Sequence, residues 1–242
     1  MTQRAASTGA RTGQASSSQN AHQRRSYNLS CTIAQALDVL GDRWTLLILR
    51  DLISGLYRYN DILESCSGMS PNVLSDRLKS LEQEGLVERK YTKGLPPKVE
   101  YTLTEKGWSV RPILLALLDW GRVHTPGFSE EKVLDGEITT DFAVRVLPAF
   151  SFNAERAEGL RLSMSVEIAE SANCTSWTLS IHDGHIHPRR HHDATANVHL
   201  KTTTRGFFLF VRGEARAEAV GELVGDPEVA AQVQSCFLSE NA

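Results

Sequence analysis

The sequence predicts an α+β protein: a helix-rich first half that ends in one hairpin, then a second half of short strands and helices. Apolar residues recur at helical spacing through most of residues 31–120, whereas the residues after Pro126 alternate between apolar and polar in short runs. A length of 242 residues is enough for two compact domains. We expect a disordered basic tail (1–28), a first domain (29–121), a linker (122–136) and a second domain (137–242).

Composition narrows the class of protein. No apolar run approaches the ~20 residues that a membrane helix needs, so we expect no membrane partner. The net charge of −3 is uneven: residues 1–30 carry four Arg and no acid, residues 31–125 are balanced, and residues 126–242 hold the acidic excess. Distant acids do not cancel local basic groups, because screening acts over ~8–10 Å. The four cysteines form no C-x-x-C pair, which is typical of the reducing cytoplasm.

The tail, residues 1–28, is rich in Ser, Thr, Gln, Ala, Gly and Arg and has almost no large apolar side chain. Such a segment buries too little surface to fold, and it lacks the apolar core of a secretory signal. We expect a flexible basic tail that touches DNA phosphates weakly.

The segment from Ser70 to Lys90 organises the first half. Ser70 fits the N-cap of a helix, Pro71 fits its first turn, and Gly85 fits its end. Leu74, Leu78 and Leu81 share one face of this helix. The opposite face and its border carry polar side chains that suit base edges and phosphates: Asn72, Ser75, Asp76, Lys79 and, at the border, Arg77. An ordinary amphipathic surface helix and a DNA-recognition helix both fit this pattern.

The neighbouring elements favour recognition. We expect helices at 31–40, at 44–53 with Asp42 as its cap, and at 61–65 with Asn60 as its cap, and a short strand at 57–59. Two strands at 86–91 and 99–103 flank a loop that carries Lys93 and Lys98. Helix, turn, capped helix and basic hairpin together make a winged helix-turn-helix, in which the helix enters the major groove and the wing lies on the neighbouring backbone.

The next helix, residues 105–120, starts after Thr104 and has an unusually wide apolar face. We expect it to form a homodimer contact, with the first helix as a neighbour, which would match palindromic half-sites. Packing against the second domain of its own chain is the alternative. Pro112 lies inside this helix and should kink it or remove one backbone hydrogen bond.

Residues 31–121 resemble the HxlR family of winged-helix regulators, which are related to MarR-type regulators. The resemblance implies a homodimer that acts on double-stranded promoter DNA, and it marks Cys31 as a residue that senses oxidants or electrophiles in some members. A thiol at a helix N-terminus can have a lowered pKa, although a packed, inert cysteine fits equally. Several segments carry the likeness: Cys31, 41–52, 59–62, 70–81, 84–87, Pro96-Pro97 with Glu100-Tyr101, and 103–107.

The second half reads as strands and turns. Residues 139–150 fit either a strand or an opening helix, and strands are expected at 160–168, 177–181, 185–187, 198–200 and 222–224. Asp183-Gly184 predicts a two-residue hairpin turn, and Asp226-Pro227 predicts the start of a last helix, which runs to about residue 238.

This order resembles the sterol-carrier-protein-like fold, a mixed α/β domain. The resemblance implies a curved sheet around a cavity for a small apolar ligand. A fully packed core of Phe and Leu is the alternative. The matching segments are 177–181 with Asp183-Gly184, 196–202, the apolar run that ends at Gly213, and 221–226.

Histidines gather in the second half. Metal binding and an exposed, pH-sensitive surface both suit such a group, but the spacing matches no metal motif, and we expect no metal and no cofactor. On a hairpin, His182 and His185 would face each other across the turn. The group comprises His182, His185, His187, His191, His192 and His199.

These observations predict a sequence-specific DNA-binding regulator, a dimeric repressor that responds to a small apolar effector or to thiol oxidation. The alternative is a hydrophobic-ligand carrier whose winged helix only mediates association. A metal-dependent enzyme is the third class, and we expect no enzyme, because the sequence contains no phosphate loop, no nucleophile elbow and no H-E-x-x-H motif.

Overall fold

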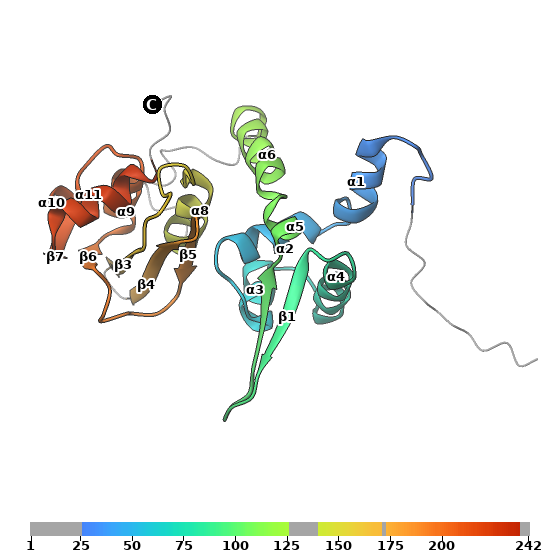
Figure 1. The fold of residues 1–242 in the computed structure, drawn as a ribbon, viewed down its shortest axis with the longest axis horizontal. Helices are drawn as coiled ribbons and strands as arrows, with labels where there is room; N and C mark the ends of the chain where they lie inside the picture. The colour runs from blue at the N-terminus through green and yellow to red at the C-terminus, as the bar shows by residue number, and fades with distance from the viewer. Residues whose placement is uncertain (1–25, 126–139, 171–172, 238–242) are drawn as a thin grey trace, which may run out of the picture. The chain divides into compact units, whose positions relative to one another are not determined.

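The structure is a computed structural model that describes residues 26–125, 140–170 and 173–237 (Figure 1). Most of the expected basic tail and residues 126–136 of the expected linker lie outside the described residues. The described residues divide into two compact units, one up to Leu40 and one from Gly41 onward, and each is described by itself. Within the described ranges, no helix has both the length and the apolar character needed to cross a bilayer.

The first unit contains helix α1 (Thr32–Leu40). The residues before it fold back on the helix, because the carboxylate of Asp38 accepts hydrogen bonds from the Ser26 hydroxyl (2.7 Å) and the Tyr27 backbone N–H (2.9 Å). Cys31 directly precedes the first turn, and its carbonyl accepts from the N–H of Gln35. The expected first helix is therefore confirmed.

The second unit begins with a winged helix-turn-helix, here called the winged-helix region (residues 41–125). Its core is apolar and includes Ile48, Leu52, Ile62, Leu74 and Leu78, all at most 2 % exposed. The α+β class with an N-terminal winged helix-turn-helix is confirmed (Figure 1). The elements are α2 (Thr45–Ile53), α3 (Tyr59–Ser65), α4 (Pro71–Gln83), β1 (Val87–Thr92), β2 (Lys98–Leu103), α5 (Glu105–Trp108) and α6 (Arg111–His124).

Two expectations around α3 are wrong. Residues 57–59 form no strand, and α3 starts at Tyr59 without a side-chain cap from Asn60. The strand signal nevertheless has a physical basis, because the carbonyl of the buried Tyr57 accepts a backbone hydrogen bond from Tyr101 of β2 (2.7 Å). Residue 57 thus lies beside the wing, and the chain turns into α3 immediately afterwards.

The expected cap of α2 is also wrong. The helix starts at Thr45, and Trp44 precedes it with a left-handed backbone (φ 81°) and no side-chain cap. The Asp42 carboxylate forms an ion pair with Arg77 of α4 instead. A carboxylate held by a guanidinium is not free to accept from the first turn of α2.

The expected helix at 105–120 is two helices. The Thr104 hydroxyl caps α5 by accepting from the N–H of Gly107 (3.1 Å), and α6 then starts at Arg111 with Pro112 in its first turn. Proline is favoured at that position, because the first turn needs no N–H from it. Pro112 therefore lies at a helix start, where it neither kinks the helix nor removes a bond from its interior.

The C-terminal region (residues 140–237) contains a five-stranded sheet in the order β5-β4-β3-β6-β7. The β3 and β6 strands are parallel, and the other neighbours are antiparallel. Residues 142–151 are helical, which decides between the two alternatives for that segment. The elements are η1 (Phe142–Val146), α8 (Leu147–Ser151), β3 (Leu162–Glu170), β4 (Asn173–His182), β5 (His185–Arg189), β6 (Val198–Thr202), α9 (Thr204–Val211), α10 (Ala217–Val220), β7 (Gly221–Gly225) and α11 (Pro227–Ser235).

Local sequence signals in this region are confirmed. Asp183 (φ 53°) and Gly184 (φ 72°) form the two-residue turn between β4 and β5, in which both backbones are left-handed. His182 and His185 are paired across this turn, as expected. The Asp226 carboxylate caps α11 by accepting from the N–H of Glu228 (2.9 Å), although the helix ends at Ser235, before residue 238.

The sheet buries one face under helices. Trp177, Val166 and Leu200 are at most 1 % exposed, and so are Phe207 and Phe210 of α9. A surface hollow of about 490 Å³ lies beside the β4–β5 turn, and charged groups line it, among them Glu155, Glu158, Arg161 and Asp183. That hollow is not lined by the core phenylalanines.

Candidate nucleic-acid interface

Helix α4 holds four of the predicted DNA-binding side chains on one exposed surface. The Ser70 hydroxyl accepts from the N–H of Val73 (3.4 Å), which fixes the start of the helix. Gly85 ends it with a left-handed backbone (φ 67°), as expected. Between these points the polar residues Asn72, Ser75, Asp76 and Lys79 are exposed, opposite the buried Leu74, Leu78 and Leu81.

Tyr59 of α3 is a residue of this surface that sequence reasoning missed. Its hydroxyl donates to the carbonyl of Pro71 (2.6 Å) and lies 3.1 Å from the Ser75 hydroxyl. The tyrosine thus fixes the first turn of α4 and occupies part of the hydrogen-bonding capacity of Ser75. No sequence signal indicated this contact, because it joins residues of two different helices.

Arg77 lies at the edge of the polar surface, in an ion pair with Asp42. Its side chain is 23 % exposed, whereas that of Asp42 is 51 % exposed. The pair holds α4 against the segment that leads into α2. A guanidinium has five N–H donors, so this ion pair leaves Arg77 donors for a phosphate.

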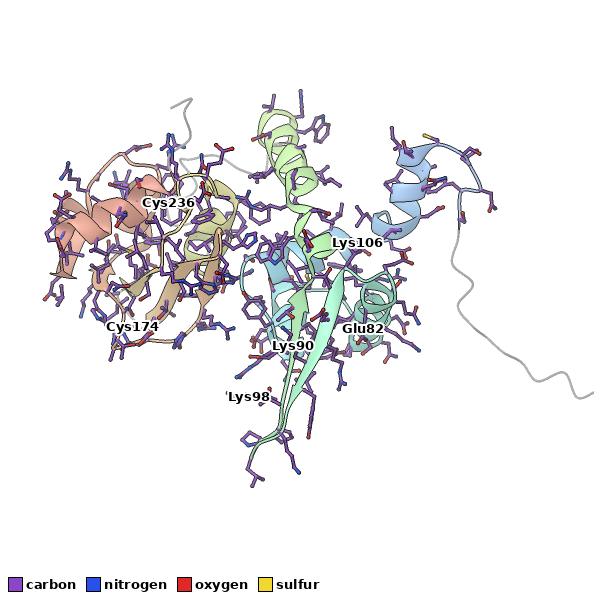
Figure 2. All side chains as sticks on the ribbon, viewed as in Figure 1. Glu82, Lys90, Lys98, Lys106, Cys174 and Cys236 are labelled. Carbon is purple, nitrogen blue, oxygen red and sulfur yellow. The ribbon has the colours of Figure 1, made fainter. Side chains whose placement is uncertain are left out.

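The wing carries basic side chains along its whole length. Lys93 and Lys98 are exposed at the two ends of the loop, as expected, and Arg89 and Lys90 of β1 are exposed as well. Figure 2 shows Lys90 and Lys98 on the hairpin. Two acids lie on the same hairpin: Glu88, whose carboxylate is 4.0 Å from the Lys90 ammonium, and Glu100 of β2, which is paired with Lys90 across the strands. The wing therefore keeps a positive surplus in a position that suits a DNA backbone.

Cys31 is exposed at the start of α1. Backbone N–H groups of Ala34 and Ile33 donate to its sulfur and lower the pKa of the thiol below its ordinary value of 9.0. The other three thiols have raised pKa values. Burial, followed by the Asp51 carboxylate, raises the pKa of Cys66 to about 12, and desolvation raises the pKa of Cys174 and Cys236.

The histidines near the β4–β5 turn take part in ring contacts. His185 stacks on Trp108 of α5 with ring centroids 4.3 Å apart, and His182 stacks on His187 at 4.1 Å. Burial is the largest cause that lowers the pKa of His187, to about 4. Within residues 26–125, 140–170 and 173–237, no group of three or more His, Cys, Asp or Glu side chains is arranged to hold a metal ion.

The winged-helix and C-terminal regions share a buried polar contact that we call the Arg145 cluster. The Arg145 guanidinium lies 3.2 Å from Asp51 of α2 and 2.9 Å from Asp141, and it also donates to the hydroxyls of Ser54 and Ser65. The side chains of Arg145 and Asp51 are 2 % and 0 % exposed. The cluster therefore ties η1 to α2.

Arg111 strengthens the same contact between the regions. Its guanidinium, at the start of α6, donates to the carbonyls of Ala149 (3.0 Å), Phe150 (3.3 Å) and Phe152 (2.8 Å). The C-terminal region thus holds the first turn of the helix for which we expected a dimer contact.

Comparison with known proteins places this geometry in a family. The family model for the HxlR-like helix-turn-helix matches residues 39–127. The HTH-type transcriptional regulator YdeP of Bacillus subtilis (strain 168) is 36 % identical over 94 residues, which are 39 % of this chain and 73 % of the relative. The chain belongs to the HxlR-like helix-turn-helix family.

One further regulator and one solved structure show the same similarity. An HTH-type transcriptional regulator of Methanothermobacter thermautotrophicus is 38 % identical over 94 residues, 39 % of this chain and 72 % of the relative. Among solved structures, the reduced form of the transcriptional regulator YodB from B. subtilis is 34 % identical, with a TM-score of 0.37. The match covers 42 % of this chain and 100 % of the YodB chain.

Proposed function

We propose that this HxlR-like transcriptional regulator is a sequence-specific dimeric repressor that reads promoter DNA with α4 and the wing. The observation that carries the proposal is the exposed polar surface of α4, which a buried leucine face and two fixed ends hold in place. Asn72 offers a bidentate amide to a base edge, Lys79 offers an ammonium, and Asp76 can accept from an exposed base amine. Such groups at one helical face suit the major groove.

The remaining predicted residues have supporting roles. Ser70 and Ser75 lie near the start of α4, where N–H groups and hydroxyls suit a phosphate. Arg77 would contact the backbone with the donors that Asp42 leaves free, and Lys93 and Lys98 would contact it from the wing. The proposed DNA-binding residues are therefore Ser70, Asn72, Ser75, Asp76, Arg77, Lys79, Lys93 and Lys98.

The homodimer is proposed from the surface of α6. Val110 and Leu114 pack inward, but Ile113 (44 % exposed), Leu117 (48 %) and Trp120 (60 %) form an exposed stripe along the same helix. Contiguous apolar surface of this kind marks an interaction site. A second copy would cover it by two-fold symmetry and would place two α4 helices on successive half-sites.

Selection of bound fragments from random duplex DNA at ~150 mM salt tests this function, since electrostatic binding alone fades at that salt concentration. We expect the intact protein to enrich a palindrome. The Asn72→Ala/Lys79→Ala variant should lose or alter the preference, because each bidentate base contact contributes about 1–3 kcal/mol of discrimination.

Glu82→Ala/Gln83→Ala is the matched control, because both side chains are exposed on α4 at its far end. This control should enrich the same palindrome as the intact protein. If folded, dimeric protein enriched no sequence, the recognition proposal would fail and the carrier function would lead. Tight lipid binding without duplex binding at low salt would support that alternative.

We further propose that oxidation of Cys31 regulates DNA binding. The supporting observation is the lowered pKa of this exposed thiol, because the thiolate is the form that reacts. Cys31 should react with iodoacetamide faster than the equally exposed Cys174, whose pKa is raised. Peroxide should release the selected palindrome from the intact protein and leave Cys31→Ser bound. Equal release from both proteins would exclude this role.

The C-terminal region, proposed as a separate sterol-carrier-like domain (137–242) after a linker (122–136), would bind a small apolar effector. Its mixed sheet, with helices packed on one face, supports this assignment. An effector could act on DNA binding through the contacts of Arg111 and Arg145 with the winged-helix region. Titration with a fluorescent fatty acid tests the proposal, and absence of saturable binding would contradict it.

A further inference from the structure

An exposed basic segment of the C-terminal region, here called the arginine–histidine segment, lies beside the wing. It comprises Arg189, Arg190, His191 and His192, which lie at and directly after the end of β5, and all four side chains are exposed. None of these residues belongs to the family match, which ends at residue 127. The roles assigned above leave this segment unused.

Contacts at the end of β5 place the segment next to the wing. The Arg189 guanidinium lies 4.9 Å from the ring centroid of Tyr57 and 3.9 Å from the Glu100 carboxylate of β2. Tyr57 is itself hydrogen-bonded to β2 through Tyr101. The Cα of Gly55 also packs so closely on Pro188 that a Cβ there would lie 1.9 Å from the Pro188 carbonyl oxygen. Strand β5 therefore ends against the base of the wing.

The segment has a fixed conformation. The His191 N–H donates to the carbonyl of Arg189 (3.0 Å), and the Thr178 hydroxyl of β4 donates to the His191 carbonyl (3.0 Å). A ring nitrogen of His192 lies 3.0 Å from the Ser165 hydroxyl of β3. The sheet thus holds this backbone in place and leaves the arginine side chains outside.

Charge on the segment continues that of the wing. Lys98 and Glu100 lie two residues apart on β2, so their side chains leave the same face about 7 Å apart, and Lys90 is paired with Glu100 across the hairpin. Arg189 engages Glu100 on that face, and among the described residues no carboxylate pairs with Arg190. Lys98 on the wing and Arg190, the residue next to the wing-contacting Arg189, are therefore not neutralised by a paired carboxylate among the described residues.

We propose that the arginine–histidine segment is a second DNA-contacting element, which binds backbone phosphates of the duplex next to the stretch that the wing contacts. The inference rests on the proposed DNA-binding function and extends it to residues outside the winged helix. Arg190 supplies a free guanidinium that suits a phosphate, and Arg189 fixes the segment beside β2. The contact adds affinity and footprint length without sequence preference.

Binding to two duplexes tests the inference: the selected palindrome alone, and the same palindrome with ten extra base pairs on each side. Arg190→Gln should bind the short duplex as the intact protein does. On the long duplex at ~0.15 M salt it should bind about fivefold more weakly for each phosphate that Arg190 neutralises in the intact complex. The log–log salt dependence should become shallower by about 1 for each such phosphate.

Arg205→Gln is the matched control, because Arg205 is also an exposed arginine of the C-terminal region, on α9, a helix that contacts η1, α8, α10 and β3. It should match the intact protein on both duplexes. Equal binding of Arg190→Gln and intact protein on the long duplex would overturn this inference alone. Failure of the intact protein to bind any selected duplex would overturn the DNA-binding function, and this inference with it.

Discussion

Two Arg–Asp pairs in this chain lie in opposite surroundings. Arg77 and Asp42 pair at the edge of the proposed DNA surface, where the carboxylate is 51 % exposed. Arg145 and Asp51 pair where the winged-helix and C-terminal regions meet, and both side chains are essentially buried. The exposed pair is free to exchange its partner for a phosphate or for water. The buried pair has no such exchange partner, because water is excluded from it.

This contrast distinguishes an exposed polar surface that suits ligand binding from a buried polar cluster that connects two regions. Polar groups on α4 and the wing remain exposed, which a DNA-reading surface requires. Polar groups of the Arg145 cluster satisfy one another, with two carboxylates and two hydroxyls around one guanidinium. The cluster therefore acts as a structural connection between the regions, whereas α4 and the wing form the proposed binding surface.

The largest expected effect is the difference in stability loss when the arginine of each pair is replaced by methionine. Arg145→Met should lower the free energy of unfolding by about 3–4 kcal/mol, because the buried Asp51 would be left with the partly exposed Arg50 as its ion partner (2.8 Å) and the Ser54 and Ser65 hydroxyls would lose the Arg145 guanidinium as a donor. Arg77→Met should lower it by less than about 1 kcal/mol, since its pair is partly solvated. Denaturant unfolding of both variants measures the difference. Equal changes in the two variants would contradict the contrast.

A compensated variant sharpens that result. Asp51→Leu/Arg145→Met removes both charges of the buried pair, and well-packed apolar replacements of such pairs are often close to neutral. Arg50, which also pairs with Asp51, has a side chain that is 25 % exposed and can turn to water. We expect the double variant to have a free energy of unfolding close to that of the intact protein and clearly above that of Arg145→Met. If the double variant were as unstable as the single one, the cost would come from poorer packing, not from an unpaired charge.

A smaller loss of stability is expected from a substitution at Gly55, where the winged-helix region packs closely on Pro188 of the C-terminal region. Gly55→Ala should cost about 3 kcal/mol, because the new Cβ would overlap the Pro188 carbonyl and the backbone is left-handed (φ 93°). Gly85→Ala should cost about 1 kcal/mol, since its backbone is also left-handed (φ 67°) but the space around it is open. Thermal unfolding compares them, and similar costs would argue against tight packing at Pro188.

The smallest effect concerns pH. Burial, together with His182, His185 and Arg189, lowers the pKa of His187 to about 4, while the Asp183 carboxylate opposes the shift. The unfolded chain binds this proton from about pH 6.5 downward, so stability is present above pH 6.5 and is lost as the pH falls towards 4. Between pH 7 and pH 4, the free energy of unfolding should fall by about 1–2 kcal/mol less in His187→Gln than in the intact protein. His191→Gln is an exposed control, and an unchanged pH slope in His187→Gln would contradict the assignment.

The elements that the sequence predicts correctly are those whose signals are local. Ser70, Pro71 and Gly85 mark the ends of α4, and Asp183-Gly184 marks the β4–β5 turn, because each acts within three or four residues of chain. The buried leucines of α4 follow from helical periodicity. The positions of five of the eight predicted DNA-binding residues, between Asn72 and Lys79 on α4, follow in the same way, and their contact with DNA stays a prediction.

What the sequence could not predict are the contacts between distant segments. Helix-start signals make Asp42 a cap for α2, but Arg77, 35 residues later, holds its carboxylate. Apolar periodicity continues across residues 105–120, so Pro112 indicates a kink inside one helix, whereas in the structure it lies at the start of a second helix. Arg145 is an isolated arginine in an apolar stretch, and only the fold brings it to Asp51, 94 residues away. Tyr59 likewise acquires its role from neighbours that the chain order does not indicate.

Hydroxyl-radical footprinting of the intact protein on its selected duplex tests the central claim most directly. We expect two protected half-sites whose centres lie about 10–10.5 base pairs apart or at a multiple of that spacing, since a two-fold dimer places one α4 in each major groove. Backbone protection should extend outward beyond both half-sites and should retract in Arg190→Gln. A single protected patch without symmetry, or protection that follows no sequence, would contradict a dimeric regulator that reads DNA through α4 and the wing.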